Sequence, residues 1–274
     1  MLKQRLLTAA ILIPLVVLAI LKLPTNIFQW LIAGVTLLAA WEWFTIVGLQ
    51  TISQRVVMMA GLGVISALSL VYLPVSFILT LVVLIWLLAT VLIVKYAHTG
   101  LPDKLAILFN QTCFGTINAV LVLVPFLLAV IWLHEAALGP QQLLYVMVSV
   151  WLADTGGYFA GKKWGKDKLA KVISPNKTWQ GVYGALALTS IWAVLAYLLN
   201  INGSLSLLAW LGLTLVTVLI SIVGDLFESL FKRAHQVKDS GNLLPGHGGI
   251  LDRIDSLIAA VPIFVAGLAV LGAL

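Results

Sequence analysis

One stretch near the end of the chain, SIVGDLFESLFKR at residues 221–233, carries the side chains best suited to chemistry. A helix turns about 100° per residue, so the polar residues of this stretch share one face and its large apolar residues point elsewhere. The polar face consists of Asp225, Glu228, Ser229 and Lys232. Two acids and a lysine at the mouth of an apolar segment indicate either a functional site or a solvated helix face held by i,i+4 ion pairs.

A second acidic group favours the functional site. After the glycine-rich turn PGHGG, the next helical segment places Asp252, Asp255 and Ser256 on one face. Carboxylates at two facing helix ends are the oxygen ligands that a hard cation such as Mg²⁺ prefers. The pattern predicts a cation site with Asp225 and Asp252 as ligands, and the neighbouring acids are Glu228 and Asp255.

Asp154, in WLADTGGYFAGKK, lies within an apolar segment, about seven residues or roughly 10 Å from its end. An acid at this depth in a membrane is costly and predicts a functional residue. The alternative is a structural hydrogen bond to Thr155 or to a neighbouring helix. The nearby glycines are then positions where helices pack closely.

Six lysines lie between Lys162 and Lys177, ending in SPNKTWQG. Several are explained by attraction to anionic lipid head groups. The sequence GYFAGKK, preceded by Gly156, approaches the P-loop pattern, but Lys163 replaces the required Ser or Thr and the segment before it is a membrane helix. The turn 174–178 is different, since its hydroxyls, backbone N–H groups and lysine suit a phosphate at the start of the following helix. Its side chains are Ser174, Lys177 and Thr178.

For two isolated polar residues the sequence predicts a role less specifically. His247 lies between glycines, where it is a general base, a phosphate neighbour or a donor that stabilises the turn. Glu42, in WEWF, lies near the end of an apolar run and is expected to anchor the membrane interface with Trp41 and Trp43.

The composition places all of these residues in a membrane protein. Of the 274 residues 62% are hydrophobic and 9% are charged, and the mean hydropathy is +1.11. A soluble domain carries about a quarter charged residues, so an all-α, polytopic membrane protein is predicted. Nine apolar runs are near the length that a bilayer needs: 6–23, 27–47, 56–73, 75–94, 113–133, 141–160, 181–200, 205–224 and 256–274. The pair broken at Pro74 is either a tight hairpin or one kinked unit. The sole cysteine, Cys113, allows no internal disulfide.

The basic residues predict the orientation. With a cytoplasmic N-terminus, only Lys22 falls outside, so 15 of the 16 basic residues lie on the cytoplasmic side. The first run is expected to be an uncleaved span rather than a signal peptide, because it is long and lacks a small-x-small cleavage site. The net charge of +6 reflects this bias rather than a nucleic-acid partner.

The polar chemistry lies in the later part of the chain. We expect the N-terminal spans, residues 1–110, and the C-terminal spans, residues 111–274, to form one integrated membrane domain. The site is expected at the cytoplasmic face of the C-terminal spans. Acids for a metal and lysines for phosphates at a membrane surface predict phosphoryl or nucleotidyl transfer to a lipid.

These stretches also resemble a known family. SLFKRAHQVKDSGNLLPGHGGILDRID, residues 229–255, resembles the signature of the phosphatidate cytidylyltransferases (CDP-diacylglycerol synthases). SPNKTWQG and ADTGGYFAGKKWGK resemble the bacterial members. The resemblance implies that CTP and phosphatidate react to CDP-diacylglycerol and pyrophosphate in the bacterial inner membrane. It also implies Mg²⁺, K⁺ as a second cation, a homodimer, and metal-binding aspartates at Asp225 and Asp252.

In that reaction the predicted roles follow the charges. Glu228 and Asp255 would orient ligands or waters, and the cationic side chains would hold triphosphate or phosphatidate oxygens. These cations are Lys177, Lys232 and Arg233, with Lys238 and Arg253 as further candidates. Two alternatives remain, a CTP-dependent lipid kinase that acts on a polyprenol-type alcohol and a cation-coupled transporter. The clustering of polar residues on one face and the lack of a repeat argue against the transporter.

Overall fold

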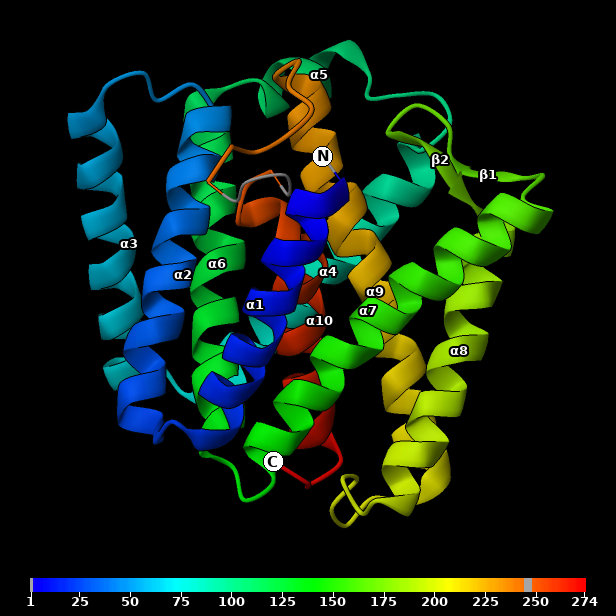
Figure 1. Ribbon diagram of the computed structural model, residues 1–274. Coiled ribbons are helices and arrows are strands. Elements are labelled where there is room, and N and C mark those ends of the chain that lie inside the picture. Colours follow the sequence, from blue (N-terminus) through cyan, green and yellow to red (C-terminus); the bar gives the residue numbers. More distant parts are fainter. Residues whose placement is uncertain (1, 244–247) are drawn as a thin grey trace.

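The computed structural model describes residues 2–243 and 248–274, so His247 lies outside the described residues. Within them the chain forms long helices that stand side by side and one short hairpin (Figure 1). The elements are α1 Leu2–Lys22, α2 Thr25–Ile46, α3 Ile52–Tyr72, α4 Val75–Tyr96, α5 Asp103–Phe109, α6 Thr112–Glu135, α7 Gly139–Trp164, β1 Lys168–Ala170, β2 Ser174–Thr178, α8 Trp179–Leu198, α9 Leu207–Ala234 and α10 Leu251–Val270.

The predicted all-α membrane fold is confirmed. In the described part of the chain, 8 helices are long and apolar enough to cross a membrane, namely α2 to α4 and α6 to α10. The remaining predicted run, 6–23, lies in α1, where Ala10–Lys22 is a shorter apolar helix. Pro74 separates two helices rather than kinking one, because it lacks an N–H and keeps the preceding Leu73 extended.

The helices that carry the acids continue beyond the apolar runs. The run 205–224 was expected to end before Asp225, but α9 continues to Ala234. The hydropathy of a run marks the part that a bilayer accepts, whereas the backbone stays helical as long as its amphipathic face can pack. The stripe at 225–232 is therefore a true helical face, as the spacing predicted.

The segment 174–178 is a strand rather than the expected turn. β2 pairs antiparallel with β1, with Lys168 opposite Thr178 and Ala170 opposite Ser174. The Thr178 hydroxyl then accepts the N–H of Gly181 at 3.2 Å and caps α8. The hairpin therefore leads directly into a helix N-terminus.

The polar connections gather at one end of the molecule. Figure 1 shows α5, the hairpin and the segment 235–243 at the end toward which the N-terminus lies, and the C-terminus at the other. α10 packs against α2, α4, α6, α7 and α9, so helices from both parts of the chain contribute to the core around it.

Close packing of α9 and α10 brings their acidic faces together. A Cβ at Gly224 would lie 2.9 Å from the carbonyl oxygen of Asp255 and 2.7 Å from the Cβ of Ala259. Only glycine allows this approach, which places Asp225 of α9 beside the first turns of α10.

Gly224→Ala is expected to lower the free energy of unfolding by about 1–3 kcal/mol, because the added methyl group forces these two helices apart. Gly212→Ala is the matched control, since it lies on the same helix and its Cβ would meet nothing within 4 Å. Thermal unfolding in detergent measures both variants. Equal melting temperatures would show that α9 and α10 do not approach at Gly224.

Candidate functional site

An ion pair joins the hairpin to α9. The Nζ atom of Lys177 lies 2.5 Å from Oδ2 of Asp225, and both side chains are about a quarter exposed. Ser229, one turn further along α9, donates its hydroxyl to Oδ1 of Asp225 at 3.3 Å. The structure thus brings together two predicted site residues that lie almost fifty positions apart in the sequence.

A second lysine joins α9 to α10. The Nζ atom of Lys232 lies 2.9 Å from Oε2 of Glu228 and 2.9 Å from Oδ1 of Asp252. Asp252 also accepts the backbone N–H groups of Ser240 and Gly249, each at 3.0 Å. Because Lys232 and Asp252 are mostly buried, with side-chain exposures of 12% and 10%, this arrangement is rigidly held.

Two further acids complete the cluster. The side chain of Glu228 is 3% exposed, and its Oε1 atom has no hydrogen-bond partner among the described residues. Asp255 accepts the N–H of Ser256 at 2.6 Å and experiences the charges of Asp225, Glu228 and Lys177. The four acids predicted on α9 and α10 therefore form one electrostatic unit.

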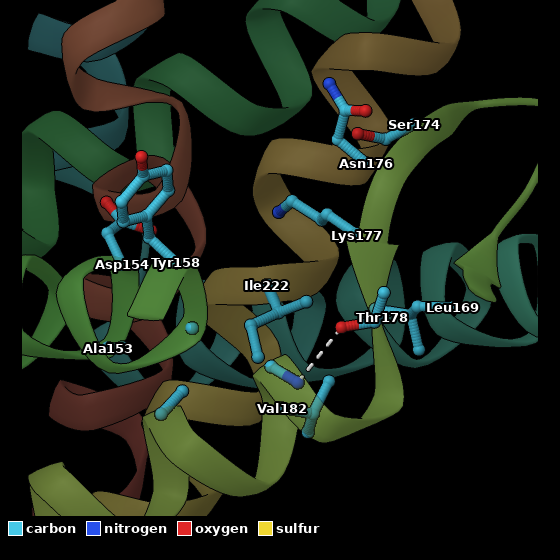
Figure 2. A pocket seen from close by; sticks show the side chains of 13 residues that line it. Ala153, Asp154, Tyr158, Leu169, Ser174, Asn176, Lys177, Thr178, Val182 and Ile222 are labelled. Carbon is cyan, nitrogen blue, oxygen red and sulfur yellow. Dashed lines mark hydrogen bonds between the residues drawn. The ribbon is translucent and has the colours of Figure 1, made fainter. Parts of the chain in front are cut away.

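A pocket of about 290 Å³ opens beside this unit, between α7, α8, α9 and β2 (Figure 2). Its polar lining consists of Asp154, Tyr158, Ser174, Asn176, Lys177 and Thr178. Figure 2 shows Lys177 extending from β2 toward α9, with Asp154 across the pocket on α7. Thr155 donates its hydroxyl to the carbonyl of Trp151, so it is not a partner of Asp154. Three of the predicted phosphate-binding residues, Ser174, Lys177 and Thr178, therefore line one space with Asp154.

The remaining predicted cations lie nearer the surface. Arg233 is exposed and donates its Nε to the carbonyl of Ile173 at 3.4 Å, which ties α9 to the hairpin turn. Lys238 is exposed, and the exposed Arg253 acts electrostatically on Asp154. These residues surround the cluster, whereas Lys177 and Lys232 lie within it.

Comparisons with known proteins identify the family of this chain. The sequence model of the Cytidylyltransferase family matches residues 3–271. The chain belongs to this family. It is 42% identical over 272 residues to the phosphatidate cytidylyltransferase of Pseudomonas aeruginosa, covering 97% of this chain and 96% of that one. It is 37% identical over 285 residues to the same-named protein of Haemophilus influenzae, covering 96% and 97%. With that of Staphylococcus aureus (strain COL) it shares 49% identity over 125 residues, covering 46% and 48%.

The acids of this cytidylyltransferase-family chain offer carboxylate oxygens, the type of ligand that a hard divalent cation prefers. Asp225 and Asp252 each bind a different lysine, and the described residues contain no group of three or more His, Cys, Asp or Glu side chains arranged around an ion. However, the cluster and the pocket hold five carboxylates against two lysines, and in the described part of the chain Oε1 of Glu228 has no hydrogen-bond partner. A divalent cation would neutralise this surplus.

Two residues at this end have roles that the sequence did not indicate. Asn176 lines the pocket, and the only signal for it is its position beside Lys177 in SPNKT. Glu42 was expected at the membrane interface, but it is 2% exposed and accepts hydrogen bonds from the segment that carries Asp252. The signal was an acid within an otherwise apolar run.

Proposed function

We propose that the protein transfers the cytidylyl group of CTP to phosphatidate and releases pyrophosphate. The observation that carries this proposal is the similarity over nearly the whole chain to two bacterial proteins named phosphatidate cytidylyltransferase. The geometry supports it, since an acidic cluster with two buried or half-buried lysines borders a pocket at one end of apolar helices.

The reaction requires positioning and charge neutralisation more than covalent chemistry by the protein. An oxygen of the phosphatidate phosphate attacks the α-phosphorus of CTP, and the bond from that phosphorus to the bridging oxygen of the β-phosphate breaks. The phosphatidate phosphate is already ionised near neutral pH, so no strong general base is needed. This weakens the case for a catalytic His247.

In this proposal the two lysines exchange carboxylate for phosphate oxygens when substrate binds. Lys177 holds a phosphate in the pocket with Ser174, and the start of α8 contributes its dipole. Lys232 lies between α9 and α10, where it reaches the other phosphate. Asp225 and Asp252, no longer paired with the lysines, would hold Mg²⁺, and this ion would supply positive charge to neutralise the phosphate oxygens of the transferred group.

The remaining parts of the proposal concern the surroundings. We place the protein in the bacterial inner membrane with the cluster facing the cytoplasm, because the sequence predicts 15 of the 16 basic residues on that side. K⁺ as a second cation and a homodimeric state complete the proposal. Crosslinking in native membranes tests the homodimer, and omission of K⁺ at constant ionic strength tests the second cation.

Purified protein given phosphatidate, Mg²⁺ and CTP is expected to place label in the extracted lipid only when the α-phosphate of CTP is labelled. The γ-label should leave as pyrophosphate, because the bond that breaks lies between the α- and β-phosphates. Heat-denatured protein is the control. Lipid label from the γ-phosphate would indicate a kinase, and no lipid label from intact protein would support the transporter.

A further inference from the structure

Glu42 is a buried acid of α2 that binds a distant part of the chain. Its side chain accepts the Ser240 hydroxyl at 2.9 Å, the N–H of Ile250 at 3.1 Å and the N–H of Leu251 at 2.8 Å. The residue is 2% exposed, and the three donors come from a segment about two hundred positions away in the sequence. A buried carboxylate is tolerated only when it is fully hydrogen-bonded, and here the hydrogen bonds define a single geometry.

The first contribution of Glu42 is to cap the N-terminus of α10. The N-cap residue of that helix, Ile250, supplies no side-chain hydrogen bond to the first turn. The first N–H groups of a helix have no partner within it and carry partial positive charge. Glu42 accepts two of these N–H groups from outside the helix and thereby fixes where α10 starts.

The second contribution reaches Asp252 through Ser240. The Ser240 hydroxyl donates to Glu42 and accepts the N–H of Asp252 at 3.3 Å. The backbone N–H of Ser240 in turn binds the Asp252 carboxylate at 3.0 Å. Asp252 binds Lys232, so a continuous set of hydrogen bonds connects Glu42 with the charged cluster.

The packing around Glu42 leaves little freedom for another geometry. A Cβ at Gly241 would lie 2.6 Å from Oε1 of Glu42. A Cβ at Gly249 would overlap both the Ser240 hydroxyl and Oε2 of Glu42. Glycine at these two positions permits the acid to approach the backbone directly after Ser240 and directly before Ile250.

We propose that Glu42 is a positioning residue, which holds Ser240 and the first turn of α10 so that Asp252 and Lys232 face the substrate phosphates. This inference rests on the proposed cytidylyl transfer. Glu42 itself touches neither substrate, because its oxygens bind the Ser240 hydroxyl and backbone N–H groups.

Glu42→Gln keeps the size of the side chain but directs an NH₂ group at backbone donors. We expect kcat to fall about 10- to 100-fold, the usual loss when a group supporting a functional ligand is removed. The KM for CTP should change little, because alignment rather than binding is lost. The measurement is turnover of α-labelled CTP per amount of folded protein, together with thermal unfolding. Glu42→Asp keeps the charge and should recover part of kcat.

Thr36→Val is the matched control, since Thr36 is also fully buried on α2 but donates only within its own helix, to Ile32. It should leave kcat near the wild-type value. Ser240→Ala should lower kcat like Glu42→Gln. The double variant should lose no more kcat than the more impaired of the two single variants, because both residues act through Asp252. Multiplied losses, or a lower melting temperature with unchanged kcat, would overturn the positioning role.

Amide hydrogen exchange separates this inference from the proposed reaction. In Glu42→Gln the amides of Ile250, Leu251 and Asp252 should exchange faster than in the wild type, whatever substrate the protein uses. Unchanged exchange would refute the role of Glu42 even if the wild type is active. An inactive wild type with faster exchange in the variant would refute the proposed reaction but support the role of Glu42 in fixing the first turn of α10. If Glu42→Gln fails to fold, Glu42→Asp and Ser240→Ala provide the same comparison.

Discussion

Asp225→Asn and Asp252→Asn are each expected to lower turnover at least about 100- to 1,000-fold while the folded protein stays in the membrane. Each substitution removes one negative charge and keeps the shape of the side chain. Asp225 binds Lys177, and Asp252 binds Lys232 and two backbone N–H groups. The amide replaces an acceptor oxygen with a donor in both places, and under our proposal it also removes a ligand of Mg²⁺.

The measurement is turnover of α-labelled CTP at several Mg²⁺ concentrations, with folded protein quantified by size-exclusion chromatography. Asp103→Asn is the matched control, because Asp103 is exposed in the first turn of α5 at the same end of the molecule. It should behave like the wild type. Near-normal turnover in either Asp225→Asn or Asp252→Asn would refute the proposed metal pair.

Lys177→Gln is expected to lower kcat/KM about 100-fold or more, because it removes the cation that extends into the pocket. The ammonium of Lys177 acts on Asp154 and Asp225 at once. Without it, two carboxylates would repel the incoming phosphates. Lys177→Arg keeps the charge and should recover part of the activity.

Lys171→Gln is the control for overall charge, since Lys171 is exposed in the turn of the same hairpin. Kinetics with varied CTP and varied phosphatidate identify which substrate Lys177 contacts, from the KM that rises. Equal effects of Lys177→Gln and Lys171→Gln would show that the lysines act only by attracting anions to the surface.

Much of this protein can be predicted from local sequence. The apolar runs predicted the helical membrane fold, because a bilayer leaves few alternatives for a chain with 9% charged residues. The spacing of Asp225, Glu228 and Lys232 predicted one helical face, and α9 presents them in that way. These features depend on the period of a helix and on hydropathy, and both are readable over about twenty residues.

Three features required the tertiary structure. The pairing of Lys177 with Asp225 depends on how the hairpin lies against α9, and SPNKT was expected to be a turn rather than a strand. The close approach of α9 and α10 at Gly224 decides that their acids form one cluster. Glu42 acts on residues about two hundred positions away, which no local period can indicate.

The amino-acid sequence by itself therefore determined the membrane class of this protein, its helices and the polar stretches that carry its chemistry. Tertiary structure alone decided that Lys177 pairs with Asp225, that Lys232 also pairs with Asp252, and that a buried glutamate of α2 caps the start of α10. The physical reason is that hydropathy and helical period act on neighbouring residues, whereas ion pairs and buried hydrogen bonds form only when distant helices pack against one another.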